Sequence, residues 1–354
     1  MTASEKVLMK GNEALAEAAI LAGCRHFFGY PITPQTEVAA YMSKRLPKVG
    51  GCYLQAESEV ASVNMVLGAG AAGVRVMTST SSPGVSLMAE GISYIAGCDV
   101  PCLIINVQRA GPGLGGIQPA QGDYWQATRG CGHGDFRLIV LAPSTVQEMV
   151  DLVSVAFDLG DRYRVPVMIL SDGLLGQMME PVVLPEPQGG LPPKPWSACG
   201  HGGARERNVV NSLYIEPPEL EEIIARRFDR YAGIEASEQR CESYLTEDAD
   251  VVLAAYGASA RVCRSAVDAA RGKGIRAGMV RPITLWPFPV SAFGQCKAAK
   301  AFLTVEMSTG QMVEDVRLAV NCGRPVEFFG RTGGIVPSPA EVLARIEDVA
   351  GRYA

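Results

Sequence analysis

Two carboxylates, Glu57 and Glu59, stand between a short strand-like segment and an Ala/Gly-rich stretch that is typical of a tightly packed helix. Carboxylates are favoured at a helix N-terminus by the helix dipole, so a solvated helix start would explain them without any function. However, the residues at 60–63, Val-Ala-Ser-Val, favour burial, and a carboxylate at the start of a buried helix is costly without a partner. The residue types therefore leave a structural and a functional carboxylate open, and do not choose between the two residues.

Arg109 directly follows the apolar run at 103–107. Such a run predicts a buried central strand, and its end would hold the guanidinium ready for a bidentate grip on a carboxylate. An internal salt bridge is the alternative explanation for this arginine.

Four polar segments follow predicted strands or begin the helices after them: GYPITP at 29–34, QAESE at 55–59, TSTSSPG at 78–84 and QRAGPG at 108–113. In an open parallel sheet, the loops at the carboxyl ends of the strands form the ligand crevice. These segments supply hydroxyl groups, carboxylates and one guanidinium, so together they predict a polar pocket.

The elements that must position this pocket alternate between strand and helix, which predicts an α/β fold with a parallel sheet. A segment rich in proline and glycine starts near residue 181 and predicts a linker, and a charged amphipathic helix follows it at 220–231. A second, smaller α/β unit follows. The predicted divisions are a first domain at 1–180, a linker with the charged helix at 181–245, and a second domain at 246–354.

The predicted elements come from local patterns of capping residues, apolar residues and turn residues. Those of the first domain are helices at 13–22 (capped by Asn12), 36–45, 58–72, 85–95 and 146–159, and strands at 25–30, 52–55, 74–78, 101–107 and 165–171. Those of the second domain are strands at 251–255, 275–280, 301–305 and 326–330, helices at 259–271 and 310–320, and a turn at 286–289.

The composition excludes several classes of function. With 48% hydrophobic and 19% charged residues, the chain is an ordinary folded protein. Its net charge of -5 and the lack of a basic run argue against nucleic acid and anionic membranes as partners. Residues 1–10 carry charges and no apolar core of a signal peptide, and the most apolar stretch, 60–74, is too short to span a bilayer. We therefore expect a cytoplasmic protein.

The ten cysteines are scattered and form no C-x-x-C pair, which fits neither a zinc ribbon nor a ferredoxin-type cluster, so we expect reduced, buried thiols. Residues 111–116 match G-x-G-x-x-G formally, but a proline lies inside the motif and no clear helix follows, so a surface or substrate-covering loop explains them better. The Ser-Asp-Gly at 171–173 departs from the Gly-Asp-Gly that begins the thiamine diphosphate–magnesium signature, and no asparagine follows at a suitable distance. We expect no diphosphate or Mg²⁺ site in this chain.

Several segments together resemble the alpha subunit of 2-oxoacid:ferredoxin oxidoreductases. They are GNEA at 11–14, GYPITP at 29–34, QAESE at 55–59, SPG at 82–84 and RPITLWPF at 281–288. The resemblance covers nearly the whole chain. It implies a parallel-sheet domain that binds the pyrimidine ring of thiamine diphosphate, followed by a smaller domain like the C-terminal domain of transketolase.

The resemblance also assigns roles to residues. In the family pattern the glutamate precedes a small-residue helix that ends in an Ala-Ala-Gly turn, and this register falls on Glu59 rather than Glu57. Glu59 would hydrogen-bond the aminopyrimidine ring and favour its imino tautomer, which activates the cofactor. Thr33 would approach the substrate and Arg109 would hold its carboxylate. Tyr30 and Pro31 would lie beside the cofactor.

The implied reaction is oxidative decarboxylation of a 2-oxoacid to acyl-CoA and CO₂, with electrons passed to ferredoxin. The implied partners are a diphosphate-binding beta subunit with Mg²⁺, a gamma subunit, and a delta subunit with [4Fe-4S] clusters. The run at 111–119 is most similar to the branch that acts on 2-oxoisovalerate and other branched-chain 2-oxoacids, and the 2-oxoglutarate branch is the alternative. A non-catalytic nucleotide-binding module and a scaffold subunit with a decayed site are alternatives of another class.

Overall fold

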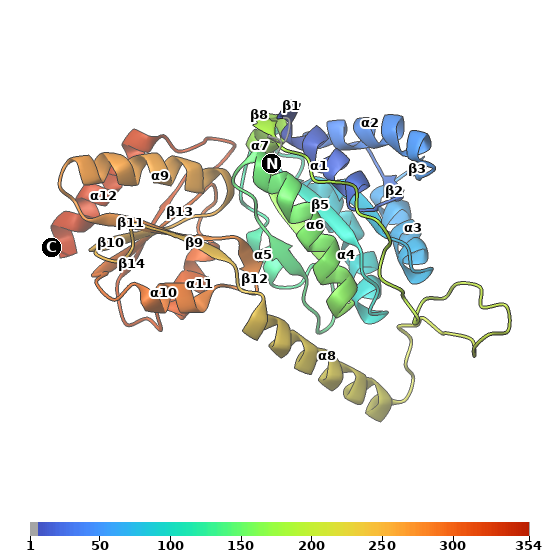
Figure 1. Ribbon diagram of the computed structural model, residues 1–354. Coiled ribbons are helices and arrows are strands. Elements are labelled where there is room, and N and C mark those ends of the chain that lie inside the picture. Colours follow the sequence, from blue (N-terminus) through green and yellow to red (C-terminus); the bar gives the residue numbers. More distant parts are fainter. Residues whose placement is uncertain (1–5, 354) are drawn as a thin grey trace.

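The computed structural model describes residues 6–353, so the first five residues of the segment examined for a signal peptide lie outside it. The chain forms two modules, each built on its own sheet (Figure 1). The first module contains a seven-stranded sheet with the order β12-β6-β7-β5-β4-β2-β3. Its strands are β2 (His26–Gly29), β3 (Cys52–Gln55), β4 (Val76–Thr80), β5 (Leu103–Gln108), β6 (Ile139–Leu141), β7 (Val167–Asp172) and β12 (Thr284–Trp286).

The pairs among β2 to β7 are all parallel, as the alternation of strands and helices predicts. Every residue of β5 and β7 is buried, which explains why both strands are almost continuously apolar. The helices of this module pack in two groups, α1 with α2 and α6, and α3 with α4. They are α1 (Gly11–Leu21), α2 (Thr36–Arg45), η1 (Leu46–Val49), α3 (Glu59–Ala71), α4 (Ser82–Gly97), α5 (Tyr124–Thr128), α6 (Val146–Tyr163) and α7 (Gly173–Gln177).

The second module contains a five-stranded sheet with the order β14-β13-β10-β11-β9. Its pairs are parallel except for β9, which runs antiparallel to β11. Its elements are β9 (Cys241–Tyr244), β10 (Val251–Ala254), α9 (Gly257–Gly272), β11 (Ala277–Pro282), α10 (Val290–Gln295), β13 (Ala301–Glu306), α11 (Met312–Ala319), β14 (Val326–Gly330) and α12 (Pro339–Tyr353).

One strand from the second half of the chain joins the sheet of the first module, which the sequence patterns did not predict. Residues 284–286, which end where the turn predicted at 286–289 begins, form strand β12, and this strand pairs antiparallel with β6 at the edge of the first sheet. Only tertiary packing makes this three-residue segment a strand, since it is too short for a periodic pattern. The predicted domain boundaries remain a prediction, with β12 crossing between the modules.

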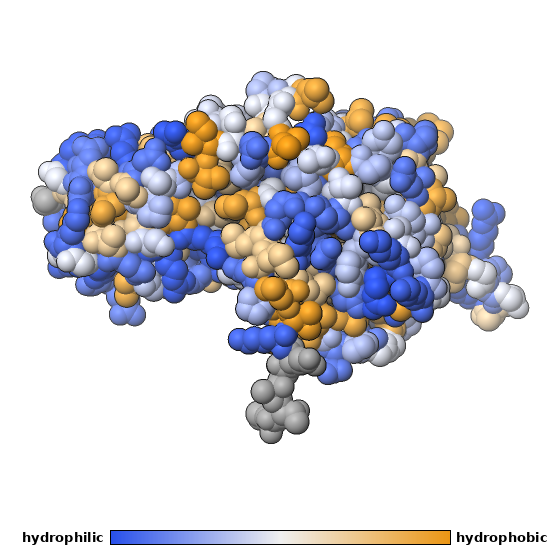
Figure 2. All heavy atoms as spheres, turned by 90° about the horizontal axis from the view of Figure 1, so that it is seen from above, coloured by the Kyte–Doolittle hydropathy of each residue, from blue (hydrophilic) through white to orange (hydrophobic). Residues whose placement is uncertain are grey.

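The segment predicted as a linker is partly ordered by pairing. Strand β8 (Met179–Val182) pairs antiparallel with β1 (Val7–Lys10). Apolar residues gather on the surface beside the start of the described chain in Figure 2, where Val7 and Leu8 of β1 are exposed. The rest of the linker runs along the first module and then extends away from it as a loop before the long helix α8 (Pro217–Ser237) (Figure 1).

Ion pairs with buried or partly buried side chains fasten the linker and α8 to the first module. The buried Arg75 guanidinium bonds Asp158 Oδ1 at 2.6 Å and Asp161 Oδ2 at 2.9 Å, and it also donates to Gln188 of the linker. Lys194 of the linker pairs with Asp161 at 2.6 Å. Oδ1 of Asp99 forms ion pairs with Arg227 and Arg230 of α8.

Most predicted elements lie where the local patterns placed them, and α2, β3 and β14 agree residue for residue. The cap by Asn12 is wrong. Helix α1 begins at Gly11, so Asn12 lies inside it, and the amide donates to Pro34 O at 2.8 Å and to Glu37 at 3.0 Å. An asparagine can cap a helix only from the extended residue before it, and Lys10 occupies that position.

All ten cysteines are free thiols. The expectation that they are buried is wrong for Cys52, Cys199 and Cys322, which are exposed. Among residues 6–353, no helix is both long and apolar enough to cross a membrane.

Candidate active site

The predicted polar segments meet at one edge of the first sheet. Strands β3, β2, β4 and β5 are neighbours in the sheet, and they run parallel, so the loops after them share an edge. The end of β4 and the start of α4, residues 80–84, contact two predicted functional residues of the neighbouring elements. Thr80 donates to Glu59, and the Ser82 hydroxyl accepts from the backbone N–H of Arg109.

The structure separates the two candidate carboxylates. Glu59 is the first residue of α3 and only 3% exposed, whereas Glu57 is exposed and accepts a hydrogen bond from Ser58 at 3.2 Å. The Ser58 hydroxyl caps α3 by accepting from Ala61 N at 3.3 Å. Capping is thus provided by Ser58, and the buried carboxylate of Glu59 is left for another purpose.

The surroundings of the Glu59 carboxylate satisfy little of its hydrogen-bonding capacity. Its side-chain hydrogen bond within the described residues is a long one, from Thr80 Oγ1 to Oε1 at 3.4 Å. It forms no ion pair with a residue of the described chain. Since a buried carboxylate normally has several hydrogen bonds or a charged partner, Glu59 has capacity for a donor from outside this chain.

Arg109 is 8% exposed at the end of β5 and holds two backbone carbonyl groups. Nη1 donates to Thr33 O at 3.0 Å, and Nη2 donates to Leu114 O at 3.1 Å, while Nε is buried without a partner. The internal salt bridge that the sequence left open does not form with any described carboxylate. The positive charge of Arg109 is therefore uncompensated and can attract an anion.

Thr33 lies next to Arg109 through its carbonyl group, and its side chain is exposed. Tyr30 is 37% exposed and Pro31 is partly buried, in the same loop after β2. Sequence reasoning missed Gln35, which is fully buried and holds this loop. Its amide donates to Tyr30 O at 3.1 Å and accepts from the Ser79 hydroxyl at 2.6 Å.

A cavity of about 640 Å³ lies beside Arg109, between the two modules. Neither Glu59 nor Thr33 lines it. The first module contributes Arg109, Ala110, Gly111, Pro112, Ala120, Gly122, Asp123 and Gln126, and the second contributes Met307, Ser308, Thr309, Gln311, Thr332 and Gly333. The contribution of the second module was not predicted, because no local pattern marks it.

The glycine-rich loop after Arg109 folds back on itself. Ala110 N donates to Gln118 O at 3.0 Å, and Gly116 N donates to Ala110 O at 2.9 Å. Arg109 and Pro119 form an isolated antiparallel β-bridge. The next helix, α5, begins only at Tyr124. A dinucleotide-binding motif would lead straight into a helix, so the geometry is that of a loop beside the cavity.

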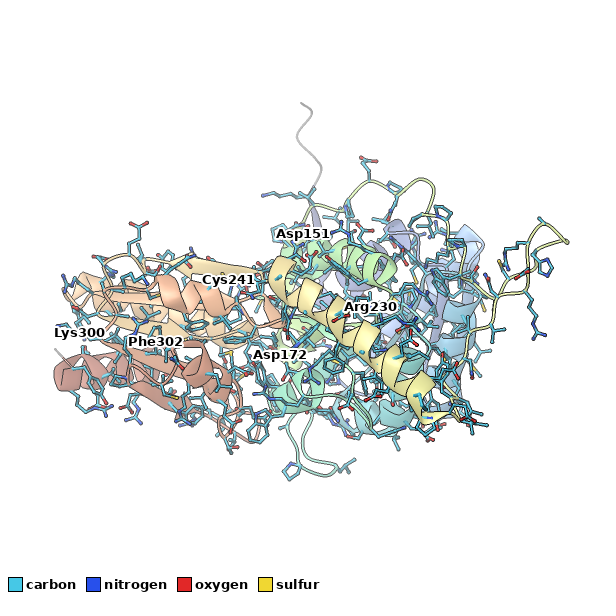
Figure 3. The ribbon with its side chains drawn as sticks, turned by 90° about the horizontal axis from the view of Figure 1, so that it is seen from below. Asp151, Asp172, Arg230, Cys241, Lys300 and Phe302 are labelled. Atoms are coloured by element: carbon cyan, nitrogen blue, oxygen red, sulfur yellow. The ribbon has the colours of Figure 1, made fainter. Side chains whose placement is uncertain are left out.

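Asp172, in the Ser-Asp-Gly segment, is a buried helix cap. Its Oδ1 accepts from the N–H groups of Leu174 at 2.9 Å and Leu175 at 3.2 Å at the start of α7. Burial raises the pKa of this carboxyl to about 6, although backbone N–H groups, including that of Ala258 in α9, oppose the shift. Figure 3 shows Asp172 in the middle of the molecule, where the two modules meet.

Comparisons with known proteins match both modules. Residues 17–194 match the family "Pyruvate flavodoxin/ferredoxin oxidoreductase, thiamine diP-bdg", and residues 249–342 match "Pyruvate:ferredoxin oxidoreductase core domain II". The chain is 50% identical to the ketoisovalerate oxidoreductase subunit VorB of Methanothermobacter thermautotrophicus, covering 97% of this chain and 98% of that protein. It is 36% identical to the 2-oxoglutarate synthase subunit KorA of the same organism, with the same coverage.

Solved structures that resemble the chain include the following two. The first is a 2-oxoglutarate:ferredoxin oxidoreductase from Magnetococcus marinus with 2-oxoglutarate, coenzyme A and succinyl-CoA bound, with a TM-score of 0.87 and 28% identity. This likeness covers 98% of the present chain and 66% of that chain. The second is a split-gene transketolase, an inactive beta4 tetramer, with a TM-score of 0.61 and 14% identity, which shows a likeness of fold.

Proposed function

The chain belongs to the thiamine-diphosphate-dependent family of pyruvate and other 2-oxoacid:ferredoxin oxidoreductases, and from this premise we propose that it is the alpha subunit of a CoA-acylating enzyme for a branched-chain 2-oxoacid. The substrate that we propose is 2-oxoisovalerate. Its oxidative decarboxylation releases CO₂, transfers the acyl group to CoA and passes electrons to ferredoxin.

Two observations support a branched-chain substrate over 2-oxoglutarate. Identity to the ketoisovalerate oxidoreductase subunit is 50%, against 36% to the 2-oxoglutarate synthase subunit. In addition, Arg109 is the one cationic side chain among the described residues that line the cavity. A 2-oxoglutarate site needs a second cation for the distal carboxylate, whereas an apolar branched chain does not.

The residues around Glu59 fit thiamine diphosphate. When bound, the cofactor supplies the nucleophile for the 2-oxo carbon and accepts the electron pair that decarboxylation leaves. Glu59 would accept a hydrogen bond from the aminopyrimidine ring, and its underused buried carboxylate supports this role. Tyr30 and Pro31 would lie beside the same ring, which agrees with their position in the loop directly after β2.

Arg109 would bind the carboxylate of the 2-oxoacid through its guanidinium, and Thr33 would border the same substrate. The support is the uncompensated charge of Arg109 and its hydrogen bond to Thr33 O. Substrate binding would thereby orient the 2-oxo group before CO₂ departs, and positioning of this kind accounts for a large part of enzymatic rate enhancement.

The site would be completed by other chains. Asp172 belongs to the Ser-Asp-Gly segment, which is the part of the sequence most similar to the diphosphate–magnesium signature. Its Oδ1 is engaged in capping α7. We assign Mg²⁺ and the diphosphate to a beta subunit, and the [4Fe-4S] clusters to a delta subunit, with a gamma subunit and ferredoxin as further partners. The cytoplasm is the proposed location.

The burial of Glu59 beside an exposed Glu57 is the observation that carries this proposal, and it defines the test. We expect Glu59→Gln to lower the turnover of the full complex with 2-oxoisovalerate at least about a hundredfold, because a neutral amide cannot favour the imino tautomer that takes part in the proton transfer. The matched control, Glu57→Gln, should stay within about twofold of the parent. Near-normal turnover of Glu59→Gln would contradict the assigned mechanism and favour a scaffold subunit.

The substrate is tested separately with the parent complex. We expect kcat/KM for 2-oxoisovalerate to exceed that for 2-oxoglutarate. The reverse order would support the 2-oxoglutarate branch and leave the role of Glu59 standing.

A further inference from the structure

Asp123 has a carboxylate whose position is not explained by its place in the sequence. It directly precedes the short helix α5, where an aspartate commonly caps the helix, yet its side chain makes no capping hydrogen bond. Instead, Oδ2 accepts from the Ser82 hydroxyl at 2.6 Å and from Asn106 Nδ2 at 2.9 Å. A single carboxylate oxygen thus joins α4 to β5.

The same network reaches the backbone of Arg109. The Ser82 hydroxyl, which donates to Asp123, accepts from Arg109 N at 3.1 Å. The hydroxyl has one proton, and its contact with the carboxylate is shorter than its 3.2 Å contact with Arg109 O. Asp123 therefore determines which way the hydroxyl points, and leaves the oxygen lone pair of Ser82 for the N–H of Arg109.

Further hydrogen bonds make the network rigid. Ser82 N donates to Asn106 Oδ1 at 3.1 Å, and Asp123 N donates to Gln108 Oε1 at 3.1 Å. Gln108 and Arg109 are thus both tied to the segment that carries Asp123.

The second module holds that segment from the other side. Gln311 donates to Gly122 O at 2.8 Å and accepts from Trp125 N at 2.8 Å, so it brackets Asp123. Asp123 and Gln311 also line the cavity beside Arg109.

We infer that Asp123 is a positioning residue for the substrate: through Ser82 it holds the Arg109 backbone in the place from which the guanidinium meets the 2-oxoacid carboxylate. This inference rests on the proposed function, in which Arg109 binds that carboxylate. Asp123 acts through Ser82 and does not itself need to touch the substrate.

The test uses the full complex and compares Asp123→Ala, Ser82→Ala and the double variant. A hydrogen bond to a charged group contributes about 1.5–3 kcal/mol, which corresponds to roughly ten- to a hundredfold. We expect each single variant to raise KM for the 2-oxoacid at least about tenfold, with kcat and KM for CoA changed less than about threefold. The double variant should be no worse than the poorer single variant, because both residues act through one hydroxyl.

Asp123→Asn provides a rescue, since its amide oxygen can still accept a hydrogen bond from Ser82. Its KM should lie between those of the parent and Asp123→Ala. Asp229→Ala on the exposed face of α8 is the matched control and should leave KM unchanged. A merely structural role would lower the amount of assembled complex or kcat for all substrates together, and that result would overturn the inference, as would effects of Ser82→Ala and Asp123→Ala that multiply.

The premise is tested in the same assay with Arg109→Lys. If this variant raises KM for the 2-oxoacid and the Asp123 and Ser82 variants do not, the positioning role alone fails. If Arg109→Lys leaves KM unchanged, the proposed function of Arg109 fails. Thermal unfolding of each variant complex, with a midpoint near that of the parent, separates either outcome from loss of folding.

Discussion

Gly84 faces the Glu59 carboxylate so closely that no side chain fits between them. A Cβ atom added to Gly84 would lie 2.5 Å from Glu59 Oε1 and 1.9 Å from Thr80 Oγ1. Both distances are below 3.0 Å, which real Cβ contacts essentially never show. The small residue of the Ser-Pro-Gly segment is thus explained by contact with the carboxylate and its hydrogen-bond donor, and not by a special backbone conformation.

Gly84→Ala should therefore displace both Thr80 and Glu59. We expect turnover of the full complex to fall at least about tenfold, because the role proposed for Glu59 depends on its exact position. Overpacking of this kind should also lower the free energy of unfolding by about 1–3 kcal/mol.

Gly68→Ala is the matched control for this variant. Gly68 also lies in a helix, and a Cβ there would meet nothing within 4 Å. We expect unchanged turnover and a gain in stability of about 0.5–1 kcal/mol, because alanine favours a helix over glycine. Equal effects of the two substitutions on turnover would contradict the role of the Gly84 contact.

Arg109→Lys should separate charge from geometry. The guanidinium holds Thr33 O and Leu114 O with two different nitrogens, and an ammonium group cannot reproduce that fork. Steady-state kinetics should show KM for the 2-oxoacid raised at least about tenfold, while KM for CoA stays within about twofold. An unchanged KM for the 2-oxoacid would show that the carboxylate is held by another group.

Gln121 should be important for the docking of the two modules. Its amide donates to Tyr256 O at 2.8 Å and accepts from the Ser259 hydroxyl at 2.7 Å and from Met307 N at 3.0 Å. Gln121→Ala would leave these buried groups unpaired, so we expect the free energy of unfolding to fall by about 2–4 kcal/mol, as measured by denaturant unfolding. Gln295→Ala, at an exposed position at the end of α10, should change it by less than about 0.5 kcal/mol.

Asp172 should make stability depend on pH. Burial raises the pKa of its carboxyl to about 6, whereas an aspartate in an unfolded chain titrates near about 3.9. Between these values the folded chain keeps a proton that the unfolded chain has released. The free energy of unfolding from this group therefore falls as pH rises through the window, by up to about 3 kcal/mol above pH 6.

Asp172→Asn removes this titration and keeps an oxygen that can cap α7. The midpoint of thermal unfolding of the variant, relative to that of the parent, should be higher at pH 7 than at pH 4.5. Asp151→Asn, at an exposed position of α6, should show a difference from the parent that is the same at both pH values. The same behaviour of both variants would contradict a buried, titrating Asp172.

The sequence by itself determined the α/β architecture and the set of candidate residues. Alternating apolar and helical patterns predicted most strands and helices, because these periods depend on residues that are close along the chain. The same patterns placed Thr33, Glu59 and Arg109 at strand ends, so that one sheet edge had to bring them near one another. The family register, and not the chemistry of carboxylates, distinguishes Glu59 from Glu57 in the sequence.

Only the tertiary structure decided which partners the polar side chains have. Nothing local indicates that Gln121 bonds Tyr256, 135 residues away, or that Gln311 bonds Trp125, 186 residues away. The pairing of β12 with β6 and the inward turn of Asn12 likewise depend on segments far along the chain. The physical reason is that buried polar groups must be hydrogen-bonded, and the partner that lies close enough in the folded chain can come from any part of the sequence.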